Sequence, residues 1–349
     1  MANSKNISFR VEQENKENFN IEDCYRQIDD IIDNDIIILH DNVRNFIFQD
    51  VNYSMIRDVT PLWIVDAGNN PESCLSKSQY DSLKQNIKHP ILGKLIYYYD
   101  LWMKIASVQD RLSAVVTFMR NFYKDIPYRT QYKEEMYTSG GRFSGERETE
   151  AYTYLNSIFI SYASVFDILS KIAVEQFEFE KYDFTKYGKM KSNDVLYKRK
   201  LFKRINESLQ NEGMLFSTPE PLVIKKIETF RNEYIHNGPW DLRFSIYYTS
   251  IEGEPADVII YSPDMDEFGH FISSGSRNKF YNQANRINFQ LPDMINETTT
   301  IIKNTINKIS SLYQDNITKK IDDTYTKECM IAIIENSLFA INSADNIEL

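Results

Sequence analysis

The sequence predicts a mainly α-helical protein with a β-hairpin insertion and an additional N-terminal helical region. Apolar residues recur at spacings of three and four along two long segments, 90–125 and 150–177, as in helices that bury one face. Aromatic and β-branched residues flank the turn formers at 252–255, which is typical of a hairpin. We therefore expect an N-terminal accessory region at residues 1–89 and a helical domain at 90–349, with the hairpin at about 241–262.

The first 89 residues carry their apolar side chains in short groups. Residues 1–20 have few of them and at most form one short strand around Ile7–Val11. From Ile21 to about His89 the groups alternate with turn formers such as Gly68-Asn69-Asn70-Pro71. This predicts short helices with a loop at 66–78.

The long helix that begins at Pro90 should end at Asp125, because Pro127 disfavours helical geometry in the residue before it. Three glycines make residues 137–146 a predicted loop. This loop lacks the Gly-Lys-Ser/Thr ending of a phosphate-binding P-loop. The helix at 150–177 follows it.

Another helix is predicted from Ser217, which has capping-box spacing to Glu220, to Asn237-Gly238, a typical helix end. After the hairpin, two more helices are expected, from Pro292 to Leu312 and around 330–341.

The composition limits the possible partners and locations. With 40 basic and 50 acidic residues, the net charge of −10 excludes a chain that binds polyanions over its whole surface. Any contact with nucleic acid must be local. The longest stretch without a charged residue, Ala151–Phe166, is shorter than the ~18 apolar residues of a membrane span, and the N-terminus has no secretory signal. We expect a cytoplasmic protein with no membrane partner.

The cysteines and histidines indicate no metal site. Cys24, Cys74 and Cys329 lie far apart without a Cys-x-x-Cys, and none of the four histidines belongs to a His-Glu-x-x-His. We expect reduced thiols and no cofactor.

Positive charge is concentrated between Lys181 and Arg204, where nine basic residues accompany two acidic ones. A local cluster of this kind can bind the phosphates of a nucleic acid. The candidate RNA-binding residues are Lys198, Arg199, Lys200, Lys203 and Arg204. The alternative is an ordinary solvated face of charged side chains.

Residues 231–238 read Arg-Asn-Glu-Tyr-Ile-His-Asn-Gly at the end of the predicted 217–238 helix. Arg231, the polar Asn232 after it, and His236 five positions after the arginine resemble the Arg-x-x-x-x-His signature of HEPN-superfamily ribonucleases. The resemblance covers about 90–316 and implies a HEPN-like helical bundle. Members with an extra domain around such a core are often toxins or antiviral effectors.

The resemblance implies a metal-independent endoribonuclease, in which the RNA 2′-hydroxyl attacks the adjacent phosphate and leaves a cyclic phosphate and a free 5′-hydroxyl. Arg231 would hold the phosphate, His236 would move protons, and Asn232 would orient one of them. Asp167, on the 150–177 helix, is a candidate for orienting Arg231, or else a solvent-facing charge.

The family places two motifs face to face across a homodimer, which implies an interface that includes the 220–238 helix with its apolar Phe230 and Tyr234. On a continuous α-helix, residues five apart differ by roughly 140°, so Arg231 and His236 share a face only if the helix ends between them.

Three alternatives stay open. Arg231 can pair with a carboxylate such as Glu228 while His236 caps the helix. The chain can be a noncatalytic scaffold that binds RNA, a nucleotide or a protein. It can also be a regulatory module whose first ~90 residues sense a phage or cellular ligand.

Overall fold

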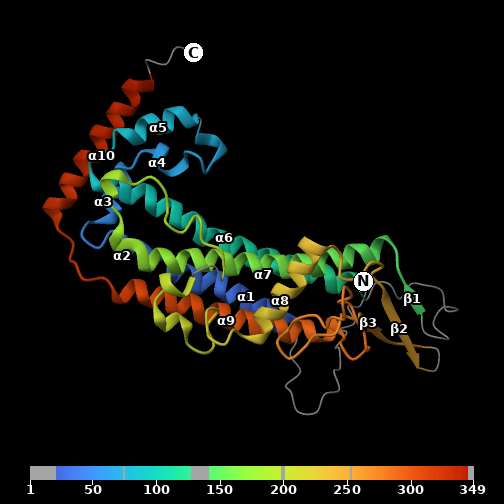
Figure 1. The fold of residues 1–349 in the computed structure, drawn as a ribbon. Coiled ribbons are helices and arrows are strands. Elements are labelled where there is room, and N and C mark those ends of the chain that lie inside the picture. Colours follow the sequence, from blue (N-terminus) through green and yellow to red (C-terminus); the bar gives the residue numbers. More distant parts are fainter. Residues whose placement is uncertain (1–20, 74, 127–140, 198–200, 252–253, 345–349) are drawn as a thin grey trace, which may run out of the picture. The chain divides into compact units, whose positions relative to one another are not determined.

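A computed structural model describes residues 21–73, 75–126, 141–197, 201–251 and 254–344. This part of the chain is mainly helical and carries a small antiparallel sheet (Figure 1). It divides into two compact units: unit 1 takes residues up to 32, 111–164 and 219–302, and unit 2 takes 33–110, 165–218 and 303 onward. The predicted boundary at residue 89 does not coincide with this division, because each unit takes residues from both sides of it.

Unit 1 is built around an aromatic core. Its helices are α1 (Ile21–Asp30), α8 (Leu222–Asn232) and parts of α6 (Pro90–Asp125), α7 (Glu146–Glu178) and α9 (Ile287–Asp315). Phe159 of α7 stacks on Phe230 of α8, with ring centroids 4.8 Å apart. The fully buried Trp240 donates its Nε1–H to Oδ1 of Asn156, 2.9 Å away. These contacts fix α8 against α7 within unit 1.

The sheet of unit 1 has the strand order β1-β2-β3, with β1 (Gly141–Phe143), β2 (Ile246–Ile251) and β3 (Glu254–Ile259) all antiparallel (Figure 1). The predicted hairpin is confirmed. The predicted loop at 137–146 is wrong at 141–143, where Arg142 pairs with Tyr247 and donates its Nε–H to Ser245 Oγ at 2.9 Å. Pairing over a hundred residues of sequence leaves no local signal, and residues 137–140 lie outside the described chain.

Unit 2 contains the short helices that follow α1 and precede residue 90. These are α2 (Ile36–Ile47), which follows a π turn at Ile31–Asp35, and then α3 (Tyr53–Val59), α4 (Leu62–Asp66) and α5 (Lys77–Gln85). Helix α10 (Asp323–Ala344) contacts this group, because Thr326 Oγ1 accepts the backbone N–H of Asn52 at 3.1 Å. The short strand expected near Ile7–Val11 lies outside the described residues.

The starts of α8 and α9 differ from the sequence prediction. Helix α8 begins at Leu222, with Pro221 as its N-cap and no side-chain cap, so the predicted capping box at Ser217 is wrong. Pro221 disfavours helical geometry at the residue before it, which delays the start. Helix α6 ends at Asp125 as predicted.

Helix α9 begins five residues before Pro292 and continues through it. A proline inside a helix cannot donate to the carbonyl four residues earlier. That carbonyl, of Asn288, accepts the hydroxyl of Tyr123 at 3.0 Å instead. The tyrosine therefore compensates for the lost helical hydrogen bond, which the sequence pattern did not reveal.

The segment 146–181 is long and apolar enough, by composition alone, to cross a membrane. The expectation based on an uncharged run missed it, because a segment that contains a few charged residues can still be apolar on average. In the structure 67% of its most apolar stretch is buried, as in a helix that packs in a protein core.

Candidate functional site

The motif that includes Arg231 and His236 lies where α8 changes into a π turn. Helix α8 ends at Asn232, the π turn covers Glu233–Asn237, and Gly238 follows with a φ of 96°. The α-helix therefore ends between Arg231 and His236, at Asn232, and the chain continues as a π turn to Asn237. In a π turn the backbone N–H of each residue bonds to the carbonyl five positions earlier. Residues five positions apart therefore lie closer to one face than they do in an α-helix.

The motif has a buried side and an exposed side. Asn232 and His236 are exposed and Arg231 is half-buried. The Arg231 Nη1–H donates to Oδ1 of Asn232 at 2.8 Å. Of the roles expected for Asn232, orienting the arginine therefore fits this geometry.

Glu233 anchors the buried side. Its carboxylate accepts hydrogen bonds from Asn237 Nδ2 at 2.8 Å and Asn278 Nδ2 at 3.2 Å, and pairs with Lys279 Nζ at 3.2 Å. The residue is 6% exposed. Sequence reasoning missed this residue, whose only local signal was a carboxylate inside the motif. Glu233 connects the π turn to residues 278–279. These contacts fix the backbone that carries the exposed side chains of the motif.

The apolar face expected at a dimer interface is largely used within the chain. Phe230 is buried on Phe159, and the half-buried Tyr234 packs edge-on against Tyr152 with centroids 5.7 Å apart. Phe230 therefore packs within the chain, and the dimer interface at the 220–238 helix stays a prediction. The apolar residue that the motif does expose is Ile235, at 45%.

Asp167 has a partner in unit 2. Its Oδ1 accepts the backbone N–H of Tyr197 at 2.9 Å, which fixes the chain after α7. Arg231 belongs to unit 1. The described contact of Asp167 is thus with a backbone amide, and its predicted action on Arg231 stays a prediction.

The basic cluster is partly described. Lys198, Arg199 and Lys200 lie outside the described residues. Lys203 is exposed, and both it and Arg204 belong to a short 3₁₀ turn, Leu201–Arg204. Arg204 is partly buried and donates to the Lys191 carbonyl at 2.8 Å. Of the two described candidates, Lys203 is therefore the more accessible to phosphate.

Glu178, at the end of α7, partly neutralises the same region. Lys181, Lys191 and Arg204 approach its carboxylate at 3.2, 3.9 and 3.6 Å. Glu178 is itself 8% exposed. Three of the nine basic residues thus have a counterion from outside the segment, and the local positive charge is smaller than the sequence count indicated.

Among the described residues, no group of three or more His, Cys, Asp or Glu side chains is placed to hold a metal ion. Comparisons with known protein families, curated protein sequences and solved structures gave no match.

Proposed function

We propose that the protein is a HEPN-like, metal-independent endoribonuclease that acts as a cytoplasmic homodimer, in phage defence or in a toxin system. The observation that carries the proposal is the state of the motif: Arg231 is hydrogen-bonded to Asn232, and His236 is exposed on the π turn that follows. The mainly helical fold is compatible with it. The defence or toxin role rests on the family resemblance alone.

The chemistry follows from these side chains. Arg231 offers further N–H donors to a phosphate whose charge grows as the 2′-hydroxyl attacks, while Asn232 limits the orientation of the guanidinium. His236 takes the proton of the attacking hydroxyl or supplies one to the leaving 5′-oxygen. In a dimer with facing motifs, one histidine performs each task. The exposed Ile235, next to His236, would contribute apolar area to that interface.

The test is cleavage of total RNA by the purified chain in EDTA. His236→Ala and Arg231→Ala should each reduce the rate by ~10²- to 10⁴-fold, the usual contribution of a positioned acid or base. His270→Ala and Arg277→Ala are matched controls, because both residues are exposed in unit 1 outside the motif. All four variants should keep the wild-type circular dichroism spectrum, and light scattering at micromolar concentration should give a dimer.

Full activity in either motif variant refutes the catalytic assignment. A strict monomer that cleaves RNA contradicts the composite site alone. RNA binding without cleavage in the wild-type protein would favour the noncatalytic scaffold.

A further inference from the structure

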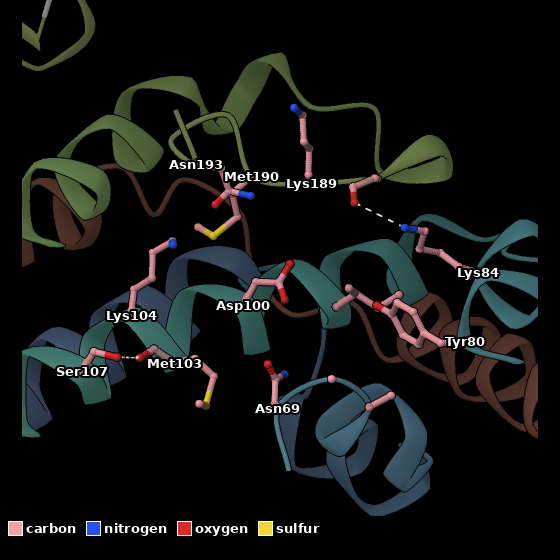
Figure 2. A pocket seen from close by; sticks show the side chains of 14 residues that line it. Asn69, Tyr80, Lys84, Asp100, Met103, Lys104, Ser107, Lys189, Met190 and Asn193 are labelled. Atoms are coloured by element: carbon pink, nitrogen blue, oxygen red, sulfur yellow. Dashed lines mark hydrogen bonds between the residues drawn. The ribbon is translucent and has the colours of Figure 1, made fainter. Parts of the chain in front are cut away.

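Unit 2 contains a cavity that the motif does not use. Its volume is about 480 Å³, within the range of pockets that bind small molecules. Three segments line it: the turn at 67–69 with α5, one face of α6, and residues 188–193 (Figure 2). All of them belong to unit 2.

The wall from α6 follows from helical spacing. Asp100, Met103, Lys104 and Ser107 recur at intervals that place them on one face of a helix. In Figure 2, Asp100 and Lys104 point into the space between α6 and the 188–193 segment. This face therefore presents a carboxylate and an ammonium group side by side to the cavity.

Lys104 lacks a counterion among the described residues. It forms no ion pair there, and its pKa is lowered, first by burial and next by the nearby positive charge of Lys171. Asp100 and Glu175 only partly oppose these effects. An anion in the cavity would relieve the repulsion and stabilise the charged form of Lys104.

A second ammonium group enters from α5. Lys84 lies over the Tyr80 ring, 5.6 Å from its centroid, and its Nζ donates to the Gly188 carbonyl at 3.4 Å, which is a long hydrogen bond. In Figure 2, Lys84 and Lys104 lie on opposite sides of Asp100. Lys189 also lines the cavity, but its side chain points away from Asp100 in that view.

Asp100 adds a second requirement for the ligand, which is a hydrogen-bond donor beside the anionic group. The Tyr187 hydroxyl donates to Oδ2 of Asp100 at 2.5 Å, and burial raises the pKa of this carboxyl group. Asp100 Oδ1 has no described hydrogen-bond donor, so a ligand hydroxyl or amino group can donate to it. Met103 and Met190 supply apolar wall on either side.

Charge decides the class of anion. Three lysines and one aspartate belong to the cavity lining, a net charge of +2, of which Lys189 at the edge, with its side chain pointing away from Asp100, supplies one. A phosphate monoester carries about −1.5 to −2 at neutral pH, and lysine binds phosphate as a point charge. A carboxylate would neutralise only half of this charge.

We propose that this cavity binds a small phosphate monoester, with the phosphate held by Lys84 and Lys104 and a hydroxyl or amino group at Asp100. The site is separate from the motif of unit 1, so the proposal does not depend on ribonuclease activity.

The test is isothermal titration calorimetry on the full chain with three probes: adenosine 5′-monophosphate, ribose 5-phosphate and inorganic phosphate. At least one monoester should bind with a Kd below about 1 mM, and adenosine, which lacks the phosphate, should not bind. Lys104→Gln and Lys84→Gln should each weaken binding about tenfold or more, because each removes a hydrogen bond to a charged group.

Lys88→Gln is the matched control. It removes the same charge four residues from Lys84, at an exposed position that does not line the cavity, and it should bind like the wild type. Asp100→Asn should bind inorganic phosphate at least as tightly as the wild type, since a negative charge is gone. The proposal is overturned if no monoester binds, if adenosine binds equally well, or if both lysine variants, folded by circular dichroism, bind like the wild type.

Discussion

Replacing Gly93 with alanine should destabilise the protein, although alanine is the better helix former. Gly93 lies inside α6, where the backbone of Phe184 approaches it. A Cβ at position 93 would lie 2.9 Å from the carbonyl carbon and 3.2 Å from the Cα of Phe184, and closer still to its carbonyl oxygen. These are backbone atoms, so no side-chain rotation relieves the clash, and the segment itself must move.

The two opposing effects have known sizes. Alanine in a helix interior is more favourable than glycine by about 1 kcal/mol. Inserting a methyl group into a fitted site typically costs about 1–3 kcal/mol, and the backbone contact puts Gly93 at the upper end of that range. The free energy of unfolding should therefore decrease by about 2 kcal/mol, the difference between these two effects.

Urea unfolding followed by circular dichroism measures this difference. Gly188→Ala is the control, because a Cβ there meets nothing within 4 Å. It should leave stability unchanged or raise it slightly. If Gly93→Ala raises stability by the helix-propensity amount, the close approach of Phe184 to α6 is refuted.

Two further predictions concern charge. Changing Lys198, Lys200 and Lys203 together to Gln should weaken RNA binding and reduce the slope of log affinity against log salt by about 0.7 for each phosphate that these lysines neutralise in the wild type; an unchanged slope would mean that they form only a solvated surface. Burial, followed by the positive charge of Arg44, lowers the pKa of His40, whose Nε2 lies 2.9 Å from the Tyr98 hydroxyl. Because the unfolded histidine titrates near about 6.5, the folded state loses stability as pH falls through that value, and His40→Gln should lose less between about pH 7.5 and 5.5 in urea unfolding. Equal losses in the two proteins would rule out His40 as a contributor.

The features that were predictable from the sequence are local ones. The stop of α6 before Pro127 and the hairpin around 252–255 depend on neighbouring residues, so the pattern was sufficient for both. Strand β1 was missed because it depends on β2, which lies a hundred residues later in the chain. The start of α8 was misplaced because Pro219 was taken as the first helical proline. Pro221, two residues later, disfavours helical geometry before it, and α8 begins at Leu222.

The candidate sites show the same division. The residue types at 231–236 could be recognised in the sequence, but the π turn could not be predicted. Nothing in the spacing of Arg231 and His236 distinguishes a π turn from an α-helical turn. The anchor at Glu233 requires residues 278–279, and the cavity requires α5, α6 and 188–193 together. Lys84 and Lys104 have no special spacing in sequence, so only tertiary structure relates them.

The shared carboxylate of Glu178 makes its surroundings unequally tolerant of substitution. Loss of Lys181, Lys191 or Arg204 leaves two cations on the carboxylate, and each such partly exposed pair contributes only about 0–1 kcal/mol. Loss of Glu178 leaves three like charges facing one another with no common counterion. The basic positions can therefore vary one at a time, whereas a change at Glu178 is accommodated only together with a change in at least one of its partners.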